Sequence, residues 1–295
     1  MSRALVLGGG GPVGIGWESG LVAGLRREGV DLGEADAVIG TSAGSFVGAL
    51  LTSGLDPGET VRELSGVRPD LTAPSRDGTT MAERMQRLMD AIMRLATSGM
   101  DEDEGRREIG RLALEAPGIP EEAFLAFFSV LRGLEWPDRF ACTAVDAESG
   151  QFVVWRKGGE ADLQHGVASS CAVPAVYSPV TIGGRRYVDG GMRDALNADV
   201  ASGHDRVLLV SVMALALPEG MSNPMFDALV GRTHAAIDGL RAEGAQVAVI
   251  EPDAELLDLS GGGTALMDAG RAEAAYEAGM RLASAEAPRI AELWN

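Results

Sequence analysis

The sequence predicts an α/β fold: one domain over residues 1–295, with a mainly parallel sheet covered by helices. Two observations carry this prediction. Apolar residues 4–7 lead into a glycine turn and a helix that reaches about Glu28, and apolar residues 35–39 lead into a second glycine turn and helix. Strand, turn and helix repeated in this way are typical of a parallel sheet with helical cover. The 40 glycines and the aromatic content of 5% favour close packing of helices on that sheet.

Residues 57–135 are predicted to be a helical insertion within this domain, because no strand pattern occurs there. Apolar residues, many of them methionine, recur at helical spacing after residue 80. Methionine adapts to flexible chains, so Met81, Met85, Met89 and Met93 could line a channel for an acyl chain or belong to a lid. An ordinary core face of a helix explains the same spacing, and both interpretations stay open.

Strand signals return after the insertion. Apolar runs predict buried strands at residues 140–145, 151–155, 206–212 and 246–250. Residues 179–188 predict a hairpin with a Gly-Gly turn, and its second strand leads directly into Asp189. Residues 265–285 predict a closing helix.

Composition excludes several classes of protein. The net charge of -18 argues against a nucleic-acid binder, which needs a basic face. It also disfavours binding to an anionic membrane, although a local patch could make transient contact with a membrane surface. The two cysteines form no C-x-x-C, and the three histidines are scattered, so no metal is expected. The first residues lack a signal-peptide pattern, and the longest apolar run is well short of the roughly 20 residues that span a bilayer. These features predict a cytoplasmic protein; they leave its oligomeric state open.

Ser42 lies in Gly40-Thr41-Ser42-Ala43-Gly44, between a predicted strand and a predicted helix. G-x-S-x-G in that context is typical of a nucleophile elbow, in which the flanking glycines permit a tight turn. The serine hydroxyl would stand above a helix N-terminus, which favours developing negative charge. The alternative is an ordinary glycine turn with a serine N-cap.

The first glycine loop, residues 8–14, also joins a strand to a helix. As an oxyanion loop it would use the N–H groups of Gly9, Gly10 or Gly11, because Pro12 has none. The same residues match G-x-G-x-x-G, so a dinucleotide site is an alternative. Its ribose-binding acid should end the second strand, but Asp31 and Asp36 both precede that strand, which weighs against this alternative. A purely structural tight turn also stays open.

Asp189-Gly190-Gly191 supplies a candidate base. A serine nucleophile needs a proton acceptor, and no histidine sits in a recognisable strand-end motif. A carboxylate is a weak base in water, but direct contact with the serine in a water-poor cleft would make it adequate. The alternative is that Asp-Gly-Gly is only a turn.

These motifs together resemble the patatin-like phospholipases, in their bacterial branch. The likeness rests on the glycine loop, on residues 40–44, and on residues 168–179 leading into Asp189, and it covers about residues 3–55 and 139–200. It implies a three-layer α/β/α sandwich and a catalytic dyad of Ser42 and Asp189 without histidine. It further implies lipid or fatty acyl ester substrates and no cofactor. Val13 stands where the family usually has arginine or lysine, so a phosphate contact from that position is missing.

The expected activity is therefore that of a serine lipid acyl hydrolase, a carboxylic ester hydrolase that forms an acyl-enzyme. The glycine-loop N–H groups would hold the oxyanion, with the N–H of Ala43 as a further donor. Transfer to an acceptor other than water stays open. The competing hypotheses are a dinucleotide-binding protein and a catalytically silent lipid-binding protein.

Overall fold

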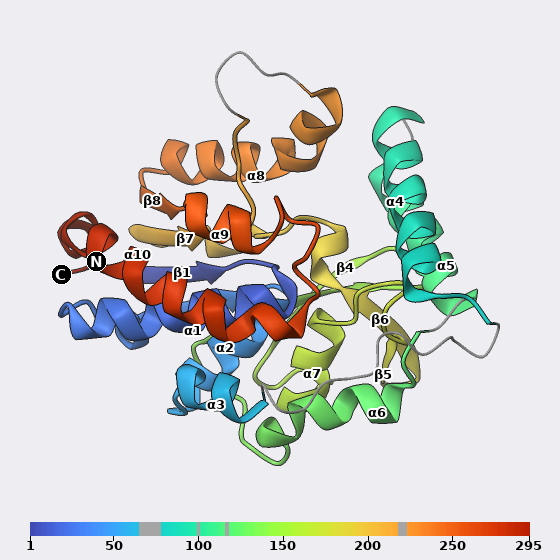
Figure 1. Ribbon diagram of the computed structural model, residues 1–295, viewed down its shortest axis with the longest axis horizontal. Coiled ribbons are helices and arrows are strands. Elements are labelled where there is room, and N and C mark those ends of the chain that lie inside the picture. The colour runs from blue at the N-terminus through green and yellow to red at the C-terminus, as the bar shows by residue number, and fades with distance from the viewer. Residues whose placement is uncertain (65–77, 99–100, 116–117, 218–222) are drawn as a thin grey trace.

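The computed structural model describes residues 1–64, 78–98, 101–115, 118–217 and 223–295 (Figure 1). The described residues form one sheet of eight strands in the order β5-β6-β3-β2-β1-β7-β8, with β4 paired to β3. The strands are β1 Arg3–Leu7, β2 Ala37–Gly40, β3 Phe140–Asp146, β4 Phe152–Arg156, β5 Val180–Ile182, β6 Arg185–Asp189, β7 Arg206–Val210 and β8 Gln246–Ile250. Every predicted strand is present.

The sheet is mainly parallel, as predicted. Strands β3, β2, β1, β7 and β8 run in one direction, and β4 and β6 pair antiparallel to β3. The β5–β6 hairpin turns at Gly183 and Gly184, whose positive φ values of 57° and 79° suit glycine. Strand β6 therefore runs back antiparallel to β3, with Asp189 at its end. A parallel strand would need a crossover connection much longer than this turn.

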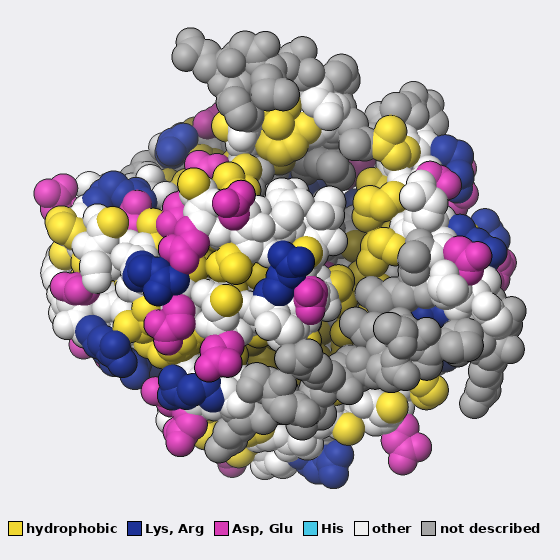
Figure 2. All heavy atoms as spheres, in the orientation of Figure 1, with side chains coloured by type: hydrophobic (Ala, Val, Ile, Leu, Met, Phe, Trp, Pro, Cys, Tyr) yellow, Lys and Arg dark blue, Asp and Glu magenta, His cyan; other side chains and the backbone are white. Residues whose placement is uncertain are grey.

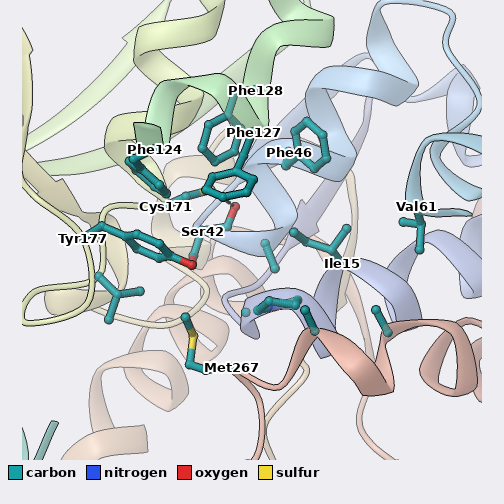
Figure 3. Close-up of a pocket in the computed structure, with 16 residues that line it drawn as sticks. Ile15, Ser42, Phe46, Val61, Phe124, Phe127, Phe128, Cys171, Tyr177 and Met267 are labelled. Atoms are coloured by element: carbon teal, nitrogen blue, oxygen red, sulfur yellow. Dashed lines mark hydrogen bonds between the residues drawn. The ribbon is translucent and has the colours of Figure 1, made fainter. Parts of the chain in front are cut away.

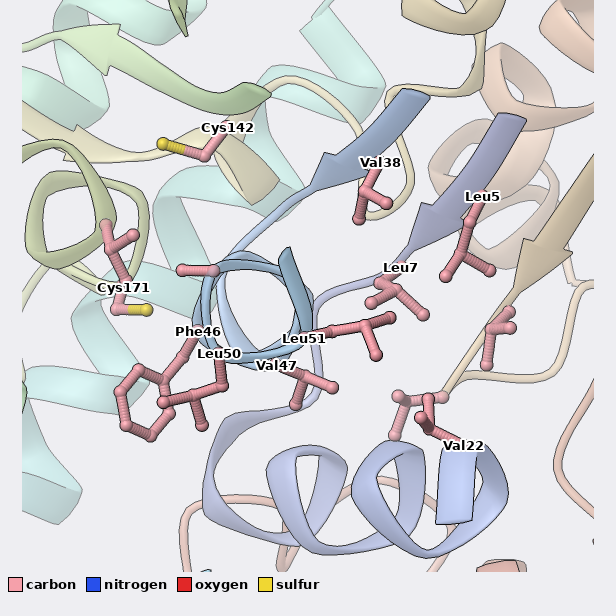
Figure 4. Packing of buried hydrophobic residues seen from close by; sticks show 14 of the residues in the cluster. Leu5, Leu7, Val22, Val38, Phe46, Val47, Leu50, Leu51, Cys142 and Cys171 are labelled. Carbon is pink, nitrogen blue, oxygen red and sulfur yellow. The ribbon is translucent and has the colours of Figure 1, made fainter. Parts of the chain in front are cut away.

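Helices cover both faces of the sheet, which confirms the three-layer α/β/α sandwich (Figure 1). Successive residues of β1 point to opposite faces. Leu5 and Leu7 pack with α1 (Gly11–Arg27), α2 (Ala43–Thr52), α7 (Leu163–Ser170) and α10 (Ala272–Trp294), a core shown in part in Figure 4. Ala4 and Val6 pack on the other face with α8 (Pro224–Ala242). This alternation follows from the period of two along a strand.

The described part of the segment between α2 and β3 consists of helices joined by loops, with an isolated β-bridge from Ile119 to Tyr177. It contains α3 Pro57–Leu64, α4 Met81–Ser98, α5 Glu102–Glu115, α6 Glu121–Leu125 and a 3₁₀ turn, Ala126–Leu131. Met85 packs against the core, whereas Met89 and Met93 are exposed, and hydrophobic side chains are visible along α4 in Figure 2. The side chain of Met81 lies outside the described residues. A lid role for these helices stays a prediction.

The closing helix differs from its predicted bounds. It begins at Ala272, not near Ala265, and continues to the buried Trp294. The preceding residues form turns instead, because the Asp268 side chain accepts the Gly270 N–H and the Leu266 carbonyl accepts the Val13 N–H. Those turns bring residues 266–269 to the glycine loop. In the described part of the chain, no helix is both long and apolar enough to cross a membrane.

Candidate active site

Ser42 occupies a strained turn between β2 and α2. Its φ of 53° and ψ of −119° are rare for a residue with a side chain, and such strain clusters at functional sites. The flanking glycines are required by space: a Cβ at Gly40 would lie 2.4 Å from Ser45 Cα, and one at Gly44 would lie 2.3 Å from the backbone carbon of Leu7. The Ser42 side chain makes no capping hydrogen bond to α2. The hydroxyl is therefore left for another role, as a nucleophile elbow requires and an N-cap would not.

Residues at the end of α7 hold the elbow from the other side. The Ser42 N–H donates to Ser170 Oγ at 3.0 Å, and the Ser42 carbonyl accepts from Cys171 Sγ at 3.1 Å and from Ser45 Oγ at 2.6 Å. All of these groups are buried. Ser170 belongs to the block that resembles the family, but its contact with Ser42 could not be predicted, because the two residues are 128 apart in the chain.

The sheet register brings Asp189 to the turn that carries Ser42. Gly40 pairs with Cys142 of β3, and Asp189 pairs with Ala144, two residues further along the same strand. Strand β4 pairs with residues 141–145 of β3, so β2 and β6 share the other edge of β3 and their ends face each other there. The aspartate at the end of β6 therefore lies next to the turn that follows Gly40.

Asp189 is buried, with 2% of its surface exposed. Its Oδ1 accepts the Gly191 N–H at 2.7 Å, whereas Oδ2 has no partner within hydrogen-bond geometry among the described residues. Burial raises the pKa of Asp189 to about 7, opposed by interactions with the Ser42 hydroxyl and the Gly191 N–H, which favour the charged form. The hydroxyl and the carboxyl thus interact without a completed hydrogen bond, a common state of catalytic pairs without substrate.

A cavity of about 140 Å³ opens beside Ser42 and has an almost wholly apolar lining (Figure 3). Aromatic rings form one wall of it: Phe128 meets Phe46 edge-on at 5.4 Å and Phe124 at 5.2 Å, and Phe124 stacks on Tyr177 at 4.0 Å. The opposite side includes Ile15 of α1 and Val61 of α3, together with residues 267–272. An apolar chain attached to a group at Ser42 would be buried here.

The glycine loop lies against the elbow. The Gly44 N–H donates to the Gly8 carbonyl at 2.9 Å, and a Cβ at Gly9 would lie 3.4 Å from Ser42 Cβ. One expectation needs correction here: the Gly9 N–H already donates to the Ala195 carbonyl at 2.8 Å, so it is not a free oxyanion donor. In the described structure, the N–H groups of Gly10, Gly11 and Ala43 have no such partner. Gly11 and Ala43 also line the cavity.

The geometry disfavours a dinucleotide site. The glycine loop follows the carboxyl end of β1, where a ribose-binding acid would have to lie. Asp36 is at the opposite edge, because its Oδ2 accepts the N–H of Arg3 at the start of β1. Asp31 pairs there with Arg26 and caps a 3₁₀ turn. Among the described residues, no group of three or more histidine, cysteine or acidic side chains is placed to hold a metal ion.

Comparison with known proteins decides the family. The sequence model of the patatin-like phospholipases matches residues 5–202, about two thirds of the chain. The chain belongs to this family. No curated protein matches this patatin-like chain. Among solved structures, VipD from Legionella pneumophila is 13% identical with a TM-score of 0.42, covering 96% of this chain and 67% of that chain. The type III effector ExoU is 17% identical with a TM-score of 0.36, covering 96% of this chain and 53% of that chain.

Val13 of the glycine loop is fully buried in the core. It therefore offers no contact to a phosphate.

Glu18 was not singled out by sequence analysis. It is fully buried in α1, its Oε1 accepts the Gly8 N–H at 2.9 Å, and its Oε2 has no hydrogen-bond partner in the described structure. Burial raises the pKa of Glu18 well above its ordinary value, and the hydrogen bond from the Gly8 N–H opposes this effect. Its hydrogen bond holds Gly8, at the start of the patatin-like glycine loop, against α1. In the sequence, a glutamate on an otherwise apolar helix face is the signal that could have identified this residue.

Proposed function

We propose that this patatin-like protein is a serine lipid acyl hydrolase that uses Ser42 as nucleophile and Asp189 as base, without histidine. One observation carries the proposal: a strained, uncapped serine lines an apolar cavity and interacts with a buried carboxyl, one oxygen of which has no hydrogen-bond partner among the described residues. Family membership supports the class of reaction. The raised pKa of Asp189 supports its role, because a base poised near neutral pH accepts a proton efficiently.

The proposed reaction has two steps. Asp189 accepts the Ser42 proton while Ser42 Oγ attacks the ester carbonyl carbon, and the oxyanion is held by N–H groups of Gly10, Gly11 and Ala43. The alcohol then leaves with the proton that Asp189 returns, and an acyl-enzyme remains. Asp189 next takes a proton from water, whose oxygen attacks the acyl carbon. The bond to Ser42 Oγ then breaks, Asp189 returns the proton to that oxygen, and the fatty acid leaves. Each oxyanion donor contributes about 3 kcal/mol to the transition state.

The cavity supports an acyl chain as the group recognised. Apolar surface buried from water yields about 25 cal/mol per Å², so aromatic and aliphatic walls favour a hydrocarbon chain. A cavity of roughly 150 Å³ holds a benzene molecule, so the cavity here, about 140 Å³, accommodates about six carbon atoms. Because Val13 replaces a basic residue, the head group is bound without a phosphate contact at that position.

The test is intact mass after exposure to a long-chain fluorophosphonate, which forms a covalent bond with an activated serine. Wild type should gain one adduct, Ser42→Ala none, and Asp189→Asn an adduct that forms at least about 100-fold more slowly, since base catalysis contributes factors of that order. Ser129→Ala is the matched control, because Ser129 is an exposed serine beside the cavity-lining Phe128 and should label as wild type does.

Two results would contradict the proposal. Full labelling of Ser42→Ala would assign the nucleophile elsewhere. Failure of folded wild type to label, together with binding of a fluorescent fatty acid, would instead identify a catalytically silent lipid-binding protein.

A further inference from the structure

We propose that Thr143 and Asn197 form a buried hydrogen-bond network that sets the position of Ser42 relative to Asp189. Thr143 and Asn197 would then both act as positioning residues. This inference rests on the proposed dyad. Neither side chain was a candidate from sequence, and neither is needed as an acid, a base or a nucleophile. Their contacts run to the residue before the serine and to the residue after the aspartate.

The strand register places Thr143 between the two halves of the dyad. Gly40 pairs with Cys142 and Asp189 pairs with Ala144, so Thr143 is the one residue of β3 between those two levels. Its hydroxyl lies 2.8 Å from the hydroxyl of Thr41, the residue that precedes Ser42. On the other side, a Cβ at Gly190 would lie 2.2 Å from Thr143 Oγ1. Thr143 thus touches both backbone segments that carry the dyad.

Asn197 joins the same two segments. Its Nδ2 has two hydrogens, which are shared among four oxygens: the Asp194 carbonyl at 2.7 Å, Thr41 Oγ1 at 3.1 Å, the Gly190 carbonyl at 3.2 Å and Thr143 Oγ1 at 3.3 Å. These side chains are all fully buried. A buried polar group that loses its partners costs free energy, so the network favours one arrangement of the two segments.

Asn197 is itself held firmly. Its backbone lies in the left-handed region with φ of 51°, and its N–H donates to Asp194 Oδ1 at 2.6 Å. Its Oδ1 accepts from Arg193 at 2.8 Å, which fixes the orientation of the amide. A network anchored in this way restricts the positions of Ser42 and Asp189 through their backbone segments. A displacement of about 1 Å in an active site can lower the rate about 100-fold, so such restriction affects catalysis directly.

The test compares Thr143→Val, which keeps the shape and removes the hydroxyl, with Thr143→Ser, which keeps the hydroxyl. Steady-state hydrolysis of a p-nitrophenyl ester gives kcat and KM, and thermal unfolding reports the fold. We expect Thr143→Val to lower kcat about 10- to 100-fold with KM within about twofold of wild type, and Thr143→Ser to stay within about threefold of wild type in both. Fluorophosphonate labelling of Ser42 should slow in parallel with kcat. Should Thr143→Val not fold, Thr41→Val against Thr41→Ser repeats the test from the other end of the contact.

The proposal is overturned if a folded valine variant keeps the wild-type kcat. It is equally overturned if the serine variant loses as much kcat as the valine variant, since packing and not the hydroxyl would then be responsible. A purely structural role would lower the unfolding temperature and leave kcat per folded molecule unchanged. Failure of the underlying dyad is distinguished separately, because Ser42→Ala would then keep the wild-type activity.

Discussion

Asp189 shows how burial converts an ordinary residue into a candidate base. In water its carboxyl would be ionised and weakly basic at neutral pH. Withdrawal from solvent disfavours the charged form, and only Gly191 and the Ser42 hydroxyl oppose that effect. One oxygen accepts the N–H of Gly191 in the Asp-Gly-Gly turn, and the other accepts no hydrogen bond of normal geometry from the described residues. The turn and the base are therefore not alternatives, since one side chain is placed to serve as both.

The pKa of Asp189 sets the expected pH dependence. Only the ionised carboxylate accepts a proton, and the pKa is raised to about 7, so kcat/KM should fall as pH drops below 7 and level off above it. The measurement is kcat/KM for a soluble ester from pH 5 to 9, with unfolding followed at each pH as the control for stability. A profile that stays flat between pH 6 and 8 would exclude Asp189 as the titrating base.

At the scale of elements, the close approach of β1 to α2 fixes the elbow. The Gly44 N–H reaches the Gly8 carbonyl, and the Thr41 N–H reaches the Leu7 carbonyl at 3.0 Å. These bonds link the glycine loop, the serine turn and the helix that starts at Ala43 into one unit. The two backbones approach this closely only because no side chain lies between them.

Gly44→Ala should therefore destabilise the protein and impair the site. The added Cβ meets the Leu7 backbone, which cannot move aside as a flexible side chain would, so we expect a loss of about 1–3 kcal/mol in the free energy of unfolding. Urea unfolding measures it. Gly239→Ala in α8 is the matched control: its Cβ would meet nothing within 4 Å, so stability should rise by about 0.5–1 kcal/mol. Equal effects of the two substitutions would refute the close-packing argument.

The whole molecule assembles the acyl cavity from distant parts of the chain. Its lining begins at Gly11 and ends at Ala272, and it includes helices on either side of the elbow. The family match ends at residue 202, yet the turns before α10 complete the cavity wall.

On the surface, acidic and basic side chains are interleaved over α9 (Ala254–Leu259) and α10, as Figure 2 shows.

Cavity size predicts selectivity for acyl length. With space for about six carbon atoms, kcat/KM should rise from acetyl to about hexanoyl esters and change little beyond them. Val61→Phe should move the optimum to shorter chains, because Val61 is 4% exposed and lines the cavity, so added bulk enters it. A p-nitrophenyl ester series from two to sixteen carbons measures this. Continued increase to sixteen carbons in wild type would refute the size argument.

The sequence by itself determined the features that depend on neighbouring residues. Both glycine turns, the Gly183-Gly184 hairpin and the strands follow from local backbone geometry and from the alternation of apolar residues, and the structure confirms them. The candidate dyad was also accessible, because a nucleophile elbow and an Asp-Gly-Gly turn are short motifs. Its chemical role stays a prediction.

Tertiary structure alone decided what lies between those motifs. The occupied N–H of Gly9, the late start of α10 and the contacts of Ser170 all arise from residues far away in the chain. Thr143 and Asn197 carry no motif. The register of β3 places Thr143 between the levels of Gly40 and Asp189, and Asn197 reaches Thr41 and Gly190 from a distant turn. Local pattern fixes which segments form. The satisfaction of buried polar groups, which depends on contacts across the whole fold, fixes which of their atoms remain free to react.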